Sequence, residues 1–209
     1  MPTSSQWIAF LVASLLFIQV PGPSLLFTLG RALTVSRREA LISVLGNGLG
    51  LVVQVVLVAV GLGAVVAASA TAYTVVKVVG AAYIVWLGLK AIRHRGDARR
   101  ALVEGTRVPT RRGQALTTGL VVGLTNPKTI VFFVAFLPQF TSEAGPAGAQ
   151  IALLGAVFAV LAVLSDSTWA VLAGAAKQWF ASKPARLDAL GAAGGTMMIG
   201  LGVTLVATE

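Results

Sequence analysis

Asp166 and Lys128 are the charged residues with the most unusual setting, because each lies inside a long apolar stretch. Asp166 stands in "VLSDSTWAV", and Lys128 directly follows Asn126-Pro127 in "GLTNPKTIVFF". A carboxylate at the centre of a membrane helix costs about 2.5–3.5 kcal/mol on insertion scales, so it should face a cavity or a partner. Asp166 is therefore a candidate proton carrier or ammonium ligand, with Lys128 as its candidate partner. The alternative is a charge pair that only holds two helices together.

Two proline motifs interrupt stretches that otherwise have the composition of membrane-spanning helices. The first is Pro21-Gly22-Pro23, and the second is Asn126-Pro127. Proline removes a backbone donor and clashes with the carbonyl one turn back, so each break frees backbone groups. Freed amides suit a carboxylate, and freed carbonyls suit an ammonium group. The two breaks together predict a binding site for an amino acid zwitterion, and a structural kink is the alternative for each.

Other polar residues in the apolar stretches have simpler interpretations. Gln54 is central in its stretch and is a candidate for the transport path, although interhelical hydrogen bonding would also explain it. We interpret Asn47 as an interhelical hydrogen-bonding residue, and Lys77 as a residue whose ammonium reaches the headgroups. Small-residue spacing predicts close helix crossings at three places, Gly46-x-x-x-Gly50, Gly119-x-x-x-Gly123 and Gly191-x-x-x-Gly195.

The composition is that of an integral membrane protein. Of the 209 residues, 56% are hydrophobic and only 11% are charged, whereas a soluble domain carries about 25% charged residues. Cysteine is absent, so no disulfide and no thiol chemistry is expected. One histidine and scattered carboxylates support neither a catalytic triad nor a metal cluster. We therefore expect a single transmembrane domain over residues 1–209 that is not an enzyme and needs no cofactor or metal.

Six stretches are long and apolar enough to cross a bilayer, which takes roughly 20 residues. They cover residues 7–29, 40–67, 72–89, 114–140, 147–176 and 187–207. Three spans in each half make the second half run inverted relative to the first. The predicted fold is an all-α membrane protein with two inverted three-helix repeats, in which helices one and four are interrupted. The repeats cover about 5–92 and 114–207, and a basic loop covers about 93–113.

The basic residues predict the orientation. Fourteen of the 16 Lys and Arg residues fall in the loops after the first, third and fifth stretches, with Arg31, Arg37 and Arg38 in the first of these loops. By the positive-inside rule these loops are cytoplasmic and both termini are external. The net charge of +9 is then a topology signal and does not indicate nucleic acid. The loop after the third stretch is solvated or touches anionic lipid headgroups.

Three segments resemble a known family. "PGPSLLFTLGRAL", "GAAYIVWLGLKAIR" and "GLVVGLTNPKTIVFFVAFLPQF" are similar, in order and spacing, to motifs of the lysine exporter (LysE/RhtB) family of amino acid efflux proteins. The resemblance covers essentially the whole chain. It implies a bacterial inner-membrane exporter of amino acids or related metabolites, driven by the proton gradient. It also places the broken-helix roles on Pro21, Gly22, Pro23, Asn126 and Pro127.

Two positions depart from the family pattern. Ser24 stands where many members have Asn, and Gln54 stands where some members have an ionisable residue. These departures leave Asp166 as the candidate for proton coupling. We expect proton antiport of a small neutral amino acid, because a dibasic substrate would favour more than one acid in the path.

Other classes of membrane protein remain as alternatives. A non-transporting scaffold or regulator would explain the breaks as structural kinks. A passive channel is disfavoured, because no ring of like charges or filter repeat is present. The expected partners are an amino acid, protons and membrane lipid, and a homo-oligomer is compatible with the sequence.

Overall fold

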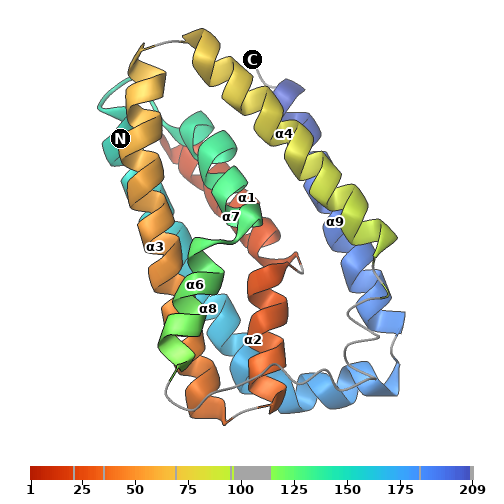
Figure 1. Ribbon diagram of the computed structural model, residues 1–209. Coiled ribbons are helices and arrows are strands. Elements are labelled where there is room, and N and C mark those ends of the chain that lie inside the picture. Colours follow the sequence, from red (N-terminus) through yellow and green to blue (C-terminus); the bar gives the residue numbers. More distant parts are fainter. Residues whose placement is uncertain are drawn as a thin grey trace.

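The computed structural model describes residues 1–20, 22–34, 36–68, 70–94, 96, 114–183 and 185–207. In these residues all regular structure is helical (Figure 1). The α-helices are α1 (Ser4–Gln19), α2 (Pro23–Thr34), α3 (Arg37–Ala68), α4 (Ala70–Arg93), α6 (Ala115–Leu124), α7 (Pro127–Val131), α8 (Ala147–Ser182) and α9 (Ala185–Ala207). A π-helix, η1 (Phe132–Phe136), and a 3-10 helix, η2 (Leu137–Phe140), continue α7. The predicted all-α class is therefore confirmed.

Three helices in the described residues are long and apolar enough to cross a membrane, at Arg37–Gly61, Thr74–Arg93 and Ala147–Leu172. The number rises to five if each of two bent pairs is one span. In the first pair α1 and α2 meet at 53°, and in the second α6 meets the α7 segment at 43°. The sixth predicted stretch is helical as α9, but α9 does not meet this criterion in its described residues.

Each bent pair is interrupted at its proline motif. Helix α1 ends at Gln19 and Val20 is extended, before α2 begins at Pro23. Pro21 lies outside the described residues. Helix α7 begins at Pro127, where the fixed φ of proline suits the first helical position. The Asn126 side chain caps α7, because its Oδ1 accepts the Lys128 backbone N–H at 3.1 Å.

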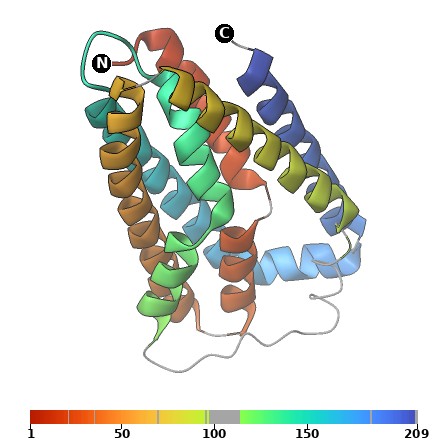
Figure 2. The same ribbon diagram turned by 45° about the horizontal axis from the view of Figure 1, so that its top comes forward.

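Two groups of helices are visible in Figures 1 and 2. Helices α3, α6 and α8 pack together with α2, whereas α4 and α9 lie side by side on the other side of α1. The apolar core between α1, η1 and α8 is aromatic. Phe17 lies 4.3 Å from Phe132 between ring centroids, and Phe132 lies 5.0 Å from Phe158 and 5.3 Å from Phe136. This aromatic cluster fills the space beside the break in helix one.

Glycines let α3 and α6 touch backbone to backbone. A methyl group added at Gly119 would overlap the Ser43 carbonyl, and one added at Gly123 would overlap the Asn47 carbonyl. Gly46 of α3 lies equally close to the backbone of α6. The predicted crossings at Gly46-x-x-x-Gly50 and Gly119-x-x-x-Gly123 are thus two sides of one contact, and they fix Asn47 beside the break in helix four. Gly195 packs in the same way, against Gly88 of α4.

The α3–α6 contact should not tolerate one added methyl group. We expect Gly123→Ala to lower the unfolding temperature of the purified protein by at least about 2 °C, because overpacking costs about 1–3 kcal/mol and each kcal/mol shifts Tm by about 2–4 °C. Gly200→Ala is the matched control, since its added methyl group would meet no atom of another described helix within 4 Å. Equal unfolding temperatures for the two variants would contradict the close crossing.

Candidate functional site

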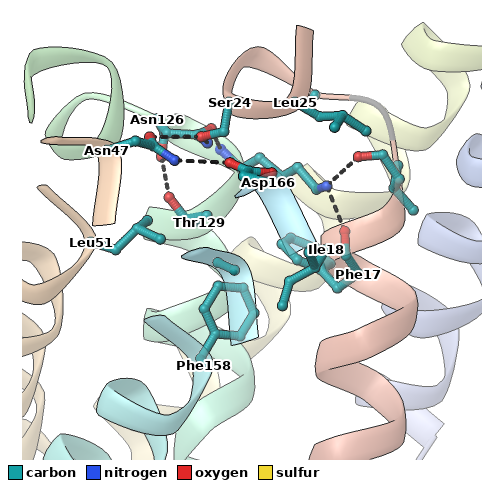
Figure 3. Close-up of a pocket in the computed structure, with 14 residues that line it drawn as sticks. Phe17, Ile18, Ser24, Leu25, Asn47, Leu51, Asn126, Thr129, Phe158 and Asp166 are labelled. Atoms are coloured by element: carbon teal, nitrogen blue, oxygen red, sulfur yellow. Dashed lines mark hydrogen bonds between the residues drawn. The ribbon is translucent and has the colours of Figure 1, made fainter. Parts of the chain in front are cut away.

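A cavity of about 30 Å³ lies where the two helix breaks meet. Its lining comes from α1, α2, α3, α7, α8 and the breaks that precede α2 and α7 (Figure 3). The lining residues are Phe17, Ile18, Val20, Gly22, Ser24, Leu25, Asn47, Leu51, Asn126, Lys128, Thr129, Phe158, Ala162 and Asp166. This volume holds about one or two water molecules. In this form, which we call closed because the site is collapsed, the space is therefore too small for an amino acid.

A polar network crosses the cavity and joins four parts of the fold. Ser24 Oγ donates to Asn47 Oδ1 at 3.0 Å, and Asn126 Nδ2 donates to Ser24 Oγ at 2.8 Å. Asn47 Nδ2 and Thr28 Oγ1 both donate to Asp166 Oδ2 at 3.3 Å. Figure 3 shows the labelled members turned toward one another. The chain of bonds runs from the break in helix four through α2 and α3 to the carboxylate on α8.

Lys128 binds the end of the first half-helix. Its side chain is 7% exposed, and Nζ donates to the carbonyls of Phe17 at 2.6 Å and Val20 at 2.7 Å. Nζ also lies 4.4 Å from the centre of the Phe17 ring. Helix ends leave carbonyls without an intrahelical partner, so the lysine satisfies groups that the break exposes.

Asp166 and Lys128 line the same cavity without a direct ion pair. Asp166 is 4% exposed, and its carboxylate accepts hydrogen bonds from the neutral side chains of Thr28 and Asn47. In the part of the chain that the structure describes, no N–O contact within 4.0 Å joins the carboxylate to the Lys128 ammonium. Each charge therefore has its own polar partners in this closed form.

Gln54 donates hydrogen bonds to the carbonyls at the second break, as Lys128 does at the first. Its side chain is 3% exposed, and Nε2 donates to the carbonyls of Gly123 at 2.8 Å and Leu124 at 2.9 Å. These carbonyls belong to the end of α6. Gln54 does not line the cavity. At both breaks, a side chain from another part of the fold thus donates hydrogen bonds to the freed carbonyls.

The structure brings four predicted site residues together, namely Gly22, Asn126, Lys128 and Asp166. Pro23 and Pro127 begin α2 and α7 beside the cavity but are not part of its lining. Asn47, which we interpreted as an interhelical hydrogen-bonding residue, has that role and also lines the cavity.

Ser24 and Thr28 are site residues that the sequence reasoning did not select. They stand four positions apart, so one helix face carries both hydroxyls. That spacing, directly after the proline motif, is the signal that could have identified them.

Arg31 also differs from the expectation. The sequence places it in a basic loop, but the structure buries it in α2, with 2% exposure. Its Nε donates to Ser43 Oγ at 3.0 Å, and its Nη2 lies 4.0 Å from Glu39 Oε2. Both partners come from the first turns of α3, and a buried charge is tolerated when it is paired in this way. Arg31 therefore joins α2 to α3 on the side of the cavity away from the aromatic cluster.

Comparison with known proteins gives the family. The model of the "LysE type translocator" family matches residues 15–209. The chain belongs to this family. The chain is 34% identical over 207 residues to a homoserine/homoserine lactone efflux protein of Salmonella typhimurium, covering 99% of this chain and 98% of the relative.

Two further relatives are similar to this chain. An uncharacterised membrane protein of Vibrio cholerae is 32% identical over 205 residues, 97% of each chain. A threonine efflux protein of Salmonella typhi is 28% identical over 124 residues, 59% of this chain and 60% of the relative. No solved structure matches the chain. The family confirms the predicted resemblance: this is a membrane protein of an amino acid efflux family, not an enzyme.

Proposed function

We propose that this LysE-type translocator exports a small neutral amino acid or a related metabolite from the cytoplasm, and that the cavity between the helix breaks is its binding site. One observation carries the proposal: two interrupted helices meet at a buried cavity that holds both a carboxylate, Asp166, and an ammonium group, Lys128. Interrupted helices near the middle of a membrane are the usual setting of a transporter's substrate site.

The names of the relatives support the substrate class. Homoserine, its lactone and threonine all carry an α-ammonium group, and homoserine and threonine carry a hydroxyl. The cavity of this chain offers hydroxyl and amide groups from Ser24, Asn47 and Asn126, which suit a small polar side chain.

The packing of the helices supports two inverted three-helix repeats. A two-fold exchange would pair helix one with four, two with five, and three with six. Under that exchange the contact between helices two and five and the contact between helices three and six each map onto themselves. The α3–α8 and α4–α9 contacts of the structure are these two contacts. In this arrangement α9 is the sixth span, packed along α4.

The proposed orientation has both termini and the loop around Gly145 outside the cell, with the basic loops inside. Helix α1 begins and α9 ends at the same end of the molecule (Figure 2), as an even number of spans requires. A topology reporter inserted at Gly145 should read external, and one fused after Arg100 should read cytoplasmic. The reverse pattern would overturn both the orientation and the inverted repeat.

The closed cavity supports alternating access. The aromatic cluster of Phe17, Phe132, Phe136 and Phe158 closes it on the proposed external side, and the Arg31–Glu39 pair lies on the cytoplasmic side. An amino acid then enters only if the α2–α3 side opens, and leaves only if the aromatic side opens. We further propose that Asp166 carries the proton that is exchanged for the substrate, because it is the carboxylate in the cavity lining.

Export from loaded cells tests the function. Cells that express the protein should release homoserine or threonine faster than cells carrying an empty vector, and an imposed pH gradient should change the rate. Release at the same rate in both strains, for every small amino acid tested, would favour a scaffold or regulator. Release that ignores the pH gradient but follows the concentration gradient would favour a passive channel.

A further inference from the structure

We propose that the carbonyls of Phe17 and Val20, together with the Phe17 ring, form the site that receives the ammonium group of the transported molecule, and that Lys128 occupies this site as a tethered stand-in in the closed form. This inference rests on the proposed function and names the contact that recognises the substrate.

The contacts around Lys128 Nζ are those of an ammonium site. A primary ammonium has three N–H donors and no acceptor. Two donors meet the Phe17 and Val20 carbonyls, at 2.6 and 2.7 Å. The ring of Phe17, 4.4 Å away, presents its negative face to the same charge. A carboxylate would be repelled by every one of these groups, so the site selects a cation.

The same site fits an α-ammonium group. The Phe17 carbonyl also accepts the Val20 N–H, at 3.3 Å, whereas within the described residues the Val20 carbonyl accepts a hydrogen bond from Lys128 alone. The carbonyls at a helix C-terminus favour a cation, which either a side chain of the protein or a ligand can supply. Because Lys128 and an amino acid both offer –NH3⁺, they would compete for one position.

The Lys128 ammonium has a second possible partner in the same cavity, the Asp166 carboxylate. Asp166 lines the cavity too, and its hydrogen bonds come from the neutral groups of Thr28 and Asn47. When a substrate ammonium displaces Lys128 from the carbonyls, the lysine can pair with this carboxylate. Gly22 lies beside the lysine stem, where a methyl group would sit 2.8 Å from Lys128 Cδ. Glycine therefore leaves the stem room to lie against the break.

Chemical rescue tests the site without any transport measurement. Lys128→Ala deletes Cγ, Cδ, Cε and Nζ, and propylammonium supplies those four atoms as a free molecule. We expect the purified variant to lose several degrees in unfolding temperature. Propylammonium at tens of millimolar should restore at least half of that loss by binding the folded state, whereas 1-propanol and propionate should not. Wild-type protein, whose site is filled, should shift much less.

Lys90→Ala is the matched control. Lys90 also lies over an aromatic ring, 5.2 Å from the centre of Trp86, but on an exposed surface. Its variant should show no specific response to propylammonium. An equal response of Lys128→Ala, Lys90→Ala and wild type, or an equal effect of propanol and propylammonium, would overturn the proposal.

A second variant covers the case in which Lys128→Ala does not fold. Lys128→Met keeps most of the stem and removes the ammonium, so the ammonium ion itself should stabilise it more than potassium at the same concentration. No difference between the two ions would count against the site. Rescue without amino acid export would leave this site standing and refute the proposed function, whereas export without rescue would refute only the ammonium site.

Discussion

Asp166→Asn should reduce proton-driven export by about tenfold or more, a change equivalent to at least about 1.4 kcal/mol, while membrane abundance stays near normal. The asparagine oxygen can still accept the Thr28 and Asn47 bonds, at 3.3 Å in the wild type, but the side chain no longer titrates. Lys128 should remain held, because its ammonium is bound to carbonyls and has no direct ion pair with Asp166. Export under an imposed pH gradient, normalised to immunoblot signal, measures this.

Three comparisons make the Asp166 result decisive. Glu143→Gln removes a carboxylate from an exposed position and should export normally. If Asp166→Asn loses abundance, and the double variant with Lys128→Gln regains both abundance and export, the two charges form only a structural pair. Export by Asp166→Asn with the pH dependence of the wild type would defeat the proton-carrier hypothesis.

Asn126→Ala should lower export by about tenfold, because it removes two contacts at the break in helix four. One is the cap of α7, worth about 0.5–2 kcal/mol. The other is the bond from Nδ2 to Ser24 Oγ at 2.8 Å, which ties this break to α2. We expect near-normal abundance, since the apolar core and the α3–α6 crossing are unchanged. Export per unit of membrane protein is the measurement.

Two neighbouring variants separate the roles of Asn126. Asn126→Asp keeps an acceptor for the Lys128 backbone N–H but loses the donor to Ser24, so an export defect in this variant assigns the effect to the polar network. Thr125→Ala is the control, because in the described residues the exposed Thr125 hydroxyl donates to Val121 O of its own helix, at 2.7 Å. Normal export by Asn126→Ala would mean that the break is a structural kink, and it would support the scaffold hypothesis.

Local chemistry allowed much of the fold to be predicted from the sequence. Proline sets the backbone of its own and the preceding residue, so the start of α7 at Pro127 follows from the motif itself. The glycine spacing likewise predicts a close crossing, because residues with little or no side chain let two helix backbones approach closely. Which helix the Gly119-x-x-x-Gly123 face would meet could not be predicted, since spacing carries no information on the partner.

The site was predicted less completely, because its contacts join distant parts of the chain. Lys128 was expected to face Asp166, the nearest obvious counter-charge, yet its ammonium binds backbone carbonyls more than a hundred positions earlier. Carbonyls exist at every residue, so the sequence cannot mark which of them a break exposes. Arg31 was assigned to a loop for a similar reason. Its burial depends on Glu39 and Ser43, which approach it only after α2 and α3 pack.

Substrate counterflow in proteoliposomes is the most direct test of the claim that an amino acid crosses the membrane through this cavity. Vesicles that contain purified protein and a high internal concentration of unlabelled homoserine or threonine should transiently accumulate the labelled compound from outside. Vesicles without internal substrate should not, and Asn126→Ala should greatly reduce the signal. Equal uptake by loaded and empty vesicles, for every small neutral amino acid tested, would contradict the proposed function. Full counterflow by Asn126→Ala would contradict the site.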